Sequence, residues 1–253
     1  MTKLILKPLR VSLSISIPIK LLSLLFAFMA LFACGIQDES AKNGYTYKID
    51  DPNGIGKWYM GREIASVMGF AGMEWLERPE REAEENVTTL LKNMNIQPGN
   101  TIADIGAGSG YHVFQMAPMA YNGLIYAVDI QKEMLDEIQS RKVNRNINNV
   151  ELVLGSETSI NLPENSVDKI LLVDVYHEFN HPYEMMQSIK KALRPNGKIY
   201  LIEYRGEDFR VPIKKVHKMT QKQAVMEMKA AGFKLKRNLD NLPWQHCMVF
   251  VKS

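Results

Sequence analysis

Three glycines at alternate positions follow an acidic residue near the middle of the chain. The run Thr101–Tyr111 reads T-I-A-D-I-G-A-G-S-G-Y, so Asp104 ends an apolar stretch and Gly106, Gly108 and Gly110 come directly after it. Glycine adopts positive φ and has no Cβ, which lets a loop bring its backbone against a ligand. The run therefore predicts a strand, a tight turn and a helix that together hold a nucleoside-bearing cofactor. A glycine-rich turn without a ligand is the alternative.

The spacing of the glycines separates two cofactor classes. Dinucleotide sites use G-x-G-x-x-G, but here Tyr111 occupies the position of the third glycine. The run instead resembles motif I of class I S-adenosylmethionine-dependent methyltransferases. That resemblance implies that Asp104 lies near the cationic methionine end of S-adenosylmethionine. It also implies a set of loop residues in contact with the cofactor: Gly106, Ala107, Gly108 and Gly110.

Later strand ends continue the resemblance. Leu124–Ile130 is apolar apart from Asp129. In the family, this acid and its neighbour Ile130 meet the ribose, although an Asp at a strand end also serves as a helix cap. The turn after Val150–Leu154 supplies an adenine contact in the family, usually from Asp, and here it offers Glu157. The residues that would approach the methyl group are Asp174 and Val175.

The remaining chain completes an α/β pattern. Two further segments resemble segments that follow in the same order in the family: Leu162–Ile170 and Leu193–Ile202. Thr220 can cap a helix that ends before Gly232. Two C-terminal strands, 233–237 and 247–252, follow. Strands alternating with helical segments favour the α/β class in their own right. The resemblance implies a Rossmann-like, seven-stranded mixed sheet with helices on both faces and an antiparallel last strand.

The sequence His177-Glu178-Phe179-Asn180-His181 formally matches the zinc-peptidase motif H-E-x-x-H. That motif needs both histidines on one face of a helix, but Pro182 disfavours helical geometry at His181. We therefore expect no metal here. In the methyltransferase interpretation, His177 and then Tyr176 are the candidate catalytic bases, since His has a suitable pKa. A purely structural His177, and transfer by alignment alone without a base, remain alternatives.

A motif-dense segment precedes the glycine loop. We expect residues 57–98 to form a helical lid, with one helix over 80–94 that begins after Pro79. In the family such helices often close over the cofactor and shape the acceptor pocket. Tyr59, Trp75 and Arg78 are the candidate lid residues, and simple packing is the alternative for the aromatic ones. Residues 99–253 form the expected methyltransferase domain.

The N-terminus has the parts of an export signal. Basic residues precede the apolar stretch Leu21–Ala33, and Leu31–Gly35 resembles a bacterial lipobox in which Cys34 is lipidated. We therefore expect a signal peptide over 1–33 and a polar tether over 34–56. Acidic residues after the apolar stretch place the domain outside the cytoplasm. An uncleaved anchor and a cytoplasmic protein with a later start are the alternatives.

The charge distribution does not favour a surface that binds nucleic acid. Four of the 31 basic residues lie in the first 33 positions, which leaves 27 basic against 28 acidic residues. No basic run remains to bind phosphates. The sequence thus predicts an exported, lipid-anchored methyltransferase that uses S-adenosylmethionine and a small-molecule acceptor. The alternatives are an inactive lipoprotein that retains the fold and, less favoured, an NAD-dependent oxidoreductase; the acceptor and the oligomeric state stay open.

Overall fold

A computed structural model describes residues 44–253, and they form one compact unit around a seven-stranded sheet. The strand order is β6-β5-β4-β7-β8-β10-β9. The first five strands in this order are parallel, and β10 runs antiparallel to both β8 and β9. The strands are β4 (Thr101–Ile105), β5 (Leu124–Asp129), β6 (Val150–Leu154), β7 (Val167–Val173), β8 (Leu193–Tyr204), β9 (Phe233–Asn238) and β10 (Gln245–Lys252). The expected Rossmann-like sheet with its antiparallel last strand is confirmed.

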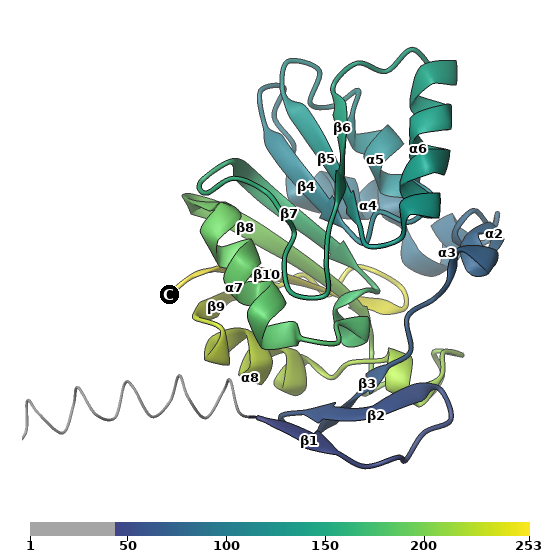
Figure 1. Ribbon diagram of the computed structural model, residues 1–253, viewed down its shortest axis with the longest axis vertical. Coiled ribbons are helices and arrows are strands. Elements are labelled where there is room, and N and C mark those ends of the chain that lie inside the picture. The colour runs from purple at the N-terminus through teal and green to yellow at the C-terminus, as the bar shows by residue number, and fades with distance from the viewer. Residues whose placement is uncertain (1–43) are drawn as a thin grey trace, which may run out of the picture. The chain divides into compact units, whose positions relative to one another are not determined.

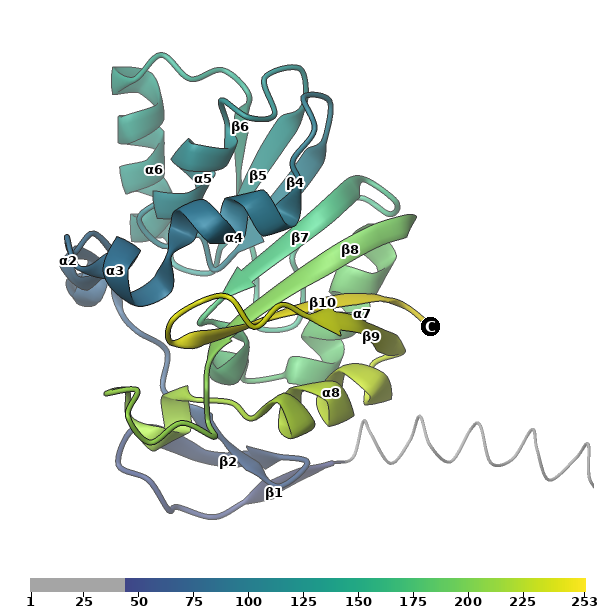
Figure 2. The ribbon, with the colours of Figure 1, turned by 180° about the vertical axis from the view of Figure 1, so that it is seen from behind.

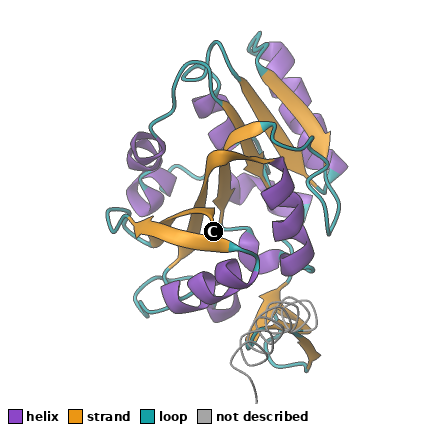
Figure 3. Ribbon diagram, turned by 90° about the vertical axis from the view of Figure 1, so that its left-hand side faces the viewer, coloured by secondary structure: helices purple, strands orange, loops and turns teal. Residues whose placement is uncertain are grey.

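Helices cover both faces of this sheet (Figures 1, 2 and 3). Successive strand residues point to opposite faces, so Ile102 packs against one helix layer while Ala103 packs against the other. The first layer contains α4 (Val87–Met94), α5 (Tyr111–Met116) and α6 (Lys132–Asn144), and the second contains α7 (Pro182–Ala192) and α8 (Gln221–Ala230). None of the helices within residues 44–253 is long and apolar enough to cross a bilayer.

The expected helical lid begins instead as a small antiparallel sheet. Strands β1 (Tyr45–Tyr47), β2 (Gly54–Tyr59) and β3 (Arg62–Ala65) pair in that order. Met60 and Gly61 both have positive φ, 49° and 88°, as a two-residue primed hairpin turn requires. Part of the segment expected as a tether is also in this sheet, because Tyr45 pairs with Tyr59 and its ring packs there, at 5.1 Å between centroids. Both expectations failed because Met-Gly is a weak hairpin signal in sequence.

The helix expected over residues 80–94 is broken in two. Asn86 takes the left-handed conformation, with φ 52°, and accepts a hydrogen bond on its side chain from the Thr89 amide. Asparagine tolerates this conformation and caps helices well. The result is α3 (Arg81–Glu85) before the break and α4 after it, preceded by the single turns η1 (Phe70–Gly72) and α2 (Met73–Leu76).

A buried ion pair attaches the small sheet to the main fold. Arg62 of β3 donates from Nε and Nη2 to the two carboxylate oxygens of Glu227 in α8, at 2.9 and 3.0 Å. The same guanidinium donates through Nη1 to the carbonyl of His177, at 3.0 Å. His177 lies in the turn η2 (Tyr176–Glu178). One side chain therefore joins the small sheet, α8 and the turn after β7.

We expect Arg62→Met to lower the free energy of unfolding by about 3–5 kcal/mol, because it leaves the buried Glu227 carboxylate without its partner. Urea denaturation of the full-length protein measures this loss. Lys132→Met is the matched control, since Lys132 and Asp136 form an exposed pair, and such pairs contribute little. Equal midpoints for the two variants would show that the Arg62 ion pair does not hold the fold together.

Candidate active site

The glycine loop connects β4 to α5 as a series of left-handed turns. Gly106, Gly108 and Gly110 have φ of 71°, 53° and 80°, values that disfavour residues with a Cβ. A Cβ on Gly106 would lie 2.4 Å from Cγ2 of Val175, and one on Gly108 would lie 2.7 Å from Cδ1 of Leu76. The missing side chains thus allow η2 and the lid to approach the loop. The loop forms one wall of a cavity of about 660 Å³.

Asp129 fixes the geometry of the loop from the neighbouring strand. Its Oδ2 accepts a hydrogen bond from the Gly108 amide and its Oδ1 accepts one from the Gln131 amide, both at 2.9 Å. The carboxylate is buried and lines the cavity. Each carboxylate oxygen has a second lone pair, so Asp129 retains acceptor capacity for ligand hydroxyls.

Two more buried carboxylates lie at the ends of β4 and β7. Oδ2 of Asp104 and Oδ1 of Asp174 have no hydrogen-bond partner among residues 44–253, while Oδ2 of Asp174 accepts a 2.6 Å bond from Gln245. Burial raises the pKa of Asp104 to about 7 although the nearby Arg81 opposes this, and burial also raises the pKa of Asp174. Unpartnered buried carboxylates are costly. They suit a cationic ligand, which is what the methionine end of S-adenosylmethionine supplies.

Arg81 contributes a cation to the same cavity. Its Nε donates to Glu85 at 2.7 Å, its Nη1 donates to the carbonyl of Leu76, and its guanidinium lies 4.4 Å from the centre of the Tyr111 ring. The sequence analysis chose Arg78 in this segment and missed Arg81. An arginine in this place suits an anionic group such as a carboxylate.

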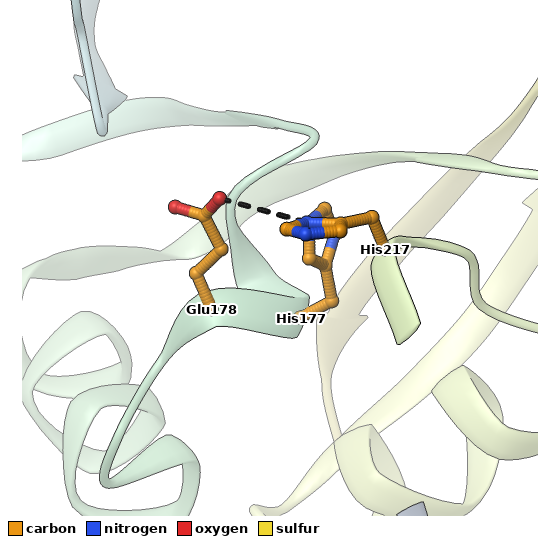
Figure 4. Close-up of side chains that lie close together, drawn as sticks. All are labelled: His177, Glu178 and His217. Atoms are coloured by element: carbon orange, nitrogen blue, oxygen red, sulfur yellow. Dashed lines mark hydrogen bonds and ion pairs between the residues drawn. The ribbon is translucent and has the colours of Figure 1, made fainter. Parts of the chain in front are cut away.

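A second polar centre lies on η2 and the turn η3 (Lys215–His217). Glu203 of β8 lies 2.6 Å from Nδ1 of His177, and both residues are buried. On the other side of the ring, Nε2 of His177 lies 3.1 Å from Nδ1 of His217. Glu178 approaches both imidazoles with Oε1 (Figure 4). His177, Glu178 and His217 all line the cavity that contains the glycine loop.

The titration of these groups follows from their surroundings. Burial lowers the pKa of His177, but the charge and hydrogen bond of Glu203 outweigh it, so the net shift is upward. Burial lowers the pKa of His217 to about 4, and the neighbouring His177 adds to that effect. Burial raises the pKa of Glu178 to about 7.

Most of the expected site residues line this cavity. Of the positions described above, Gly106, Gly108, Asp129, Asp174 and His177 line it, whereas Asp104 is buried and does not. Trp75, Ile130, Glu157 and Val175 also line it. Ala107 and Gly110 shape the loop from behind, since Ala107 packs into the core and Gly110 caps α5. Their roles toward the cofactor stay predictions. Cys34 lies outside the described residues.

Three expected site residues point elsewhere. Tyr176 is fully buried against Phe179, because adjacent side chains of a 3₁₀ turn diverge and His177 takes the cavity side. Tyr59 packs in a separate cluster with Ile64 and Tyr183. Arg78 stacks 3.7 Å above Trp75 and pairs with Glu84 and Glu85. The structure therefore corrects the catalytic role of Tyr176 and the pocket roles of Tyr59 and Arg78.

Comparison with known proteins settles the family. Residues 96–245 match the family model described as "Methyltransferase domain". The chain belongs to this methyltransferase family. The uncharacterized methyltransferase YdaC of Bacillus subtilis (strain 168) is 29% identical over 154 residues, covering 60% of this chain and 82% of YdaC. The demethylmenaquinone methyltransferase of Oceanobacillus iheyensis is 25% identical, covering 45% of this chain and 48% of that protein.

A solved structure agrees with the fold of this methyltransferase. A SAM-dependent methyltransferase from Aquifex aeolicus superposes with a TM-score of 0.69 at 22% identity, covering 73% of this chain and 98% of that one. The protein is thus a methyltransferase that uses S-adenosylmethionine, and the buried acids around the glycine loop fit that cation.

The affinity for S-adenosylmethionine should rise with pH through the titration of Asp104. The cationic cofactor favours the ionised carboxylate, whose pKa in the free protein is about 7. Affinity should therefore increase about tenfold per pH unit up to about pH 7 and then level off. The stability of the free protein depends on pH in the opposite sense. Because the pKa of Asp104 is raised in the folded state, the free energy of unfolding falls as pH rises toward about 7.

Isothermal titration of the full-length protein between pH 5.5 and 8.5 measures this dependence. Asp104→Asn should bind weakly, with a flatter profile, because its amide does not ionise. A wild-type affinity independent of pH over this range would contradict the role given to Asp104.

Proposed function

We propose that this methyltransferase methylates a small molecule in the cavity beside the glycine loop. The acceptor loses its proton at the second polar centre, formed by His177, Glu178, Glu203 and His217 (the His177 centre). The observation that carries the proposal is the shared cavity: His177, Gly106 and Asp129 all line it. Methyl donor and acceptor must meet in one enclosed space for in-line transfer. The His177 centre supplies polar side chains to this cavity from outside the glycine loop, where an acceptor can contact them.

The pairing with Glu203 suits His177 to proton removal. When Glu203 accepts the Nδ1 proton, Nε2 keeps its lone pair, 3.1 Å from Nδ1 of His217, in a residue that lines the cavity. Methyl transfer to a hydroxyl or similar acceptor forms a bond from the acceptor atom to the methyl carbon and breaks the carbon–sulfur bond. The acceptor's proton must leave, and Nε2 is placed to receive it.

The size and lining of the cavity favour a small acceptor. Ligand cavities of roughly 300–1,000 Å³ hold small molecules, and this one has about 660 Å³. Apolar side chains such as Val67, Met68 and Phe179 line much of it. The near-neutral charge after the first 33 residues offers no attraction to a nucleic acid.

Incubation of the full-length protein with methyl-labelled S-adenosylmethionine and a cell extract tests this proposal. We expect label in the fraction that passes a size filter of about 1 kDa, a size that a cavity of this class accommodates. Asp129→Ala, which removes the carboxylate that holds the loop, serves as the blank. Label confined to protein or nucleic acid, or no product despite cofactor binding, would contradict a small-molecule methyltransferase.

We further propose that the chain is exported and anchored by lipid at Cys34. The support is the order of features in the sequence: basic residues, an apolar stretch and the lipobox-like run Leu31–Gly35. An acyl chain on Cys34 would hold the domain at the outer face of the cytoplasmic membrane. A cytoplasmic protein with a later start is the competing hypothesis.

Metabolic labelling with palmitate in a bacterial host measures the anchor. The wild-type protein should incorporate label and fractionate with membranes, and Cys34→Ala should lose the label. Cys247→Ala is the matched control, because Cys247 is buried in β10 and should not be acylated. Label that persists in Cys34→Ala would refute acylation at this position.

A further inference from the structure

We propose that His177, His217 and Glu178 bind one divalent transition-metal ion, for which Zn²⁺ is the best fit, at the wall of the methyl-transfer cavity. The three ligand atoms would be Nε2 of His177, Nδ1 of His217 and Oε1 of Glu178. Two imidazoles and one carboxylate form a donor set that zinc commonly uses when a further coordination position stays open.

The distances among these atoms have the size that a shared ion requires. Nε2 of His177 and Nδ1 of His217 are 3.1 Å apart, and Oε1 of Glu178 lies 3.9 Å from the first and 3.8 Å from the second. A point equidistant from atoms so spaced is about 2.1 Å from each, which is the length of a zinc–nitrogen or zinc–oxygen bond. A hydrogen bond between the imidazoles can explain only the shortest of these three distances. Oε1 of Glu178 lies beyond hydrogen-bond range of both rings, so the other two distances need another cause.

The residues that contact His177 hold it as a metal-binding histidine is held. Glu203 engages Nδ1 of His177 at 2.6 Å, so the opposite nitrogen is directed at the proposed ion. Carboxylate–histidine pairs of this kind orient metal ligands and raise their basicity. Arg62 holds the backbone of the same residue through the carbonyl of His177. The Met68 amide donates to Oε1 of Glu178, at 3.3 Å.

The charges around the centre also favour a cation. Glu203 and Glu178 both face the imidazoles. Of the cations close by, Arg62 already pairs with Glu227 through two hydrogen bonds, and Lys214, whose charge acts on His217, donates to Asn53. With both carboxylates ionised and both rings neutral, the centre carries a net negative charge inside the protein. A divalent ion balances it while the histidines remain unprotonated, as ligands must be.

The ligand set is assembled from residues far apart in the chain, so the H-E-x-x-H motif could not predict it. His181, the second histidine of H-E-x-x-H, lies at the start of α7 with its Nδ1 near Glu157, 3.5 Å away, and is not part of the centre. His217 of η3, which lies 40 positions after His177, takes its place. Nothing in the spacing of the motif points to that residue.

This site deepens the proposed function and rests on it for its chemical role. An acceptor hydroxyl or thiol bound at the open position would become more acidic and would lose its proton to water. The acceptor atom then forms its bond to the methyl carbon while the carbon–sulfur bond breaks, and the sulfonium becomes a neutral thioether. With the ion in place, the lone pair on Nε2 of His177 is committed to the metal, and water takes the acceptor's proton in place of His177 because the ion lowers the pKa of the bound acceptor.

Zinc binding by the full-length protein, purified in detergent without a histidine tag, tests the site. Competition with a chromophoric chelator should show one tightly bound Zn²⁺ per chain, and Co²⁺ should give the visible bands of a low-coordinate site. His217→Ala should weaken zinc binding more than about 100-fold. Loss of a metal ligand should cost more than the 10–100-fold effect of changing a residue that only hydrogen-bonds to a ligand. Glu203→Gln should fall within that 10–100-fold range.

His181→Ala is the matched control, because it removes a histidine of the same motif that lies outside the centre. Circular dichroism checks the fold of each variant, and His217 suits substitution because its side chain is partly exposed. Equal zinc affinity in wild type and His217→Ala, or an equal loss in His181→Ala, would overturn the site. Small-molecule methylation without zinc binding would refute the metal site alone, whereas zinc binding without methylation of a small molecule would refute the proposed function alone.

Discussion

The guanidinium of Arg62 is the contact on which the geometry of the second polar centre depends. It reaches from β3 to the carboxylate of Glu227 in α8 and to the carbonyl of His177 in η2. All three residues are buried or nearly so, and a buried charge that loses its partner is strongly destabilising. The small sheet, α8 and η2 are therefore held in one arrangement. That arrangement directs the His177 ring toward the cavity and toward Glu203.

The cavity is built from two halves with different physical logic. The cofactor half combines the backbone of the glycine loop, whose amides bind Asp129, with carboxylates at the ends of neighbouring parallel strands. The other half uses side chains carried by short turns, η2 and η3, whose positions are set by long-range contacts. The unpartnered oxygens of Asp104 and Asp174 make the first half costly without a ligand. Strain and burial of this kind are common where a protein gives up stability for binding.

The sequence predicted the main sheet and the cofactor half because both are encoded locally. Alternating apolar stretches and the glycine spacing placed β4, β5 and the loop, and Thr220 marked the start of α8, where its side chain accepts from the Gln223 amide. Of the second half, the sequence predicted His177 but not its partners Glu203 and His217, because these residues meet only in space. His217 lies in a polar segment with no motif of its own. Glu203 offered a clue as an acid inside the apolar strand β8, where a charge requires a partner.

The region matched to the methyltransferase family begins at residue 96, yet β1, β2 and β3 all precede that point. Arg62 thus lies outside the region matched to the family, yet its side chain holds Glu227 and His177, which lie inside it. The boundary drawn by common ancestry and the boundary of the working unit are therefore different. Leu76 and Arg81, which line the cavity beside the glycine loop, also precede residue 96, so both sides of the cavity depend on chain outside the matched region.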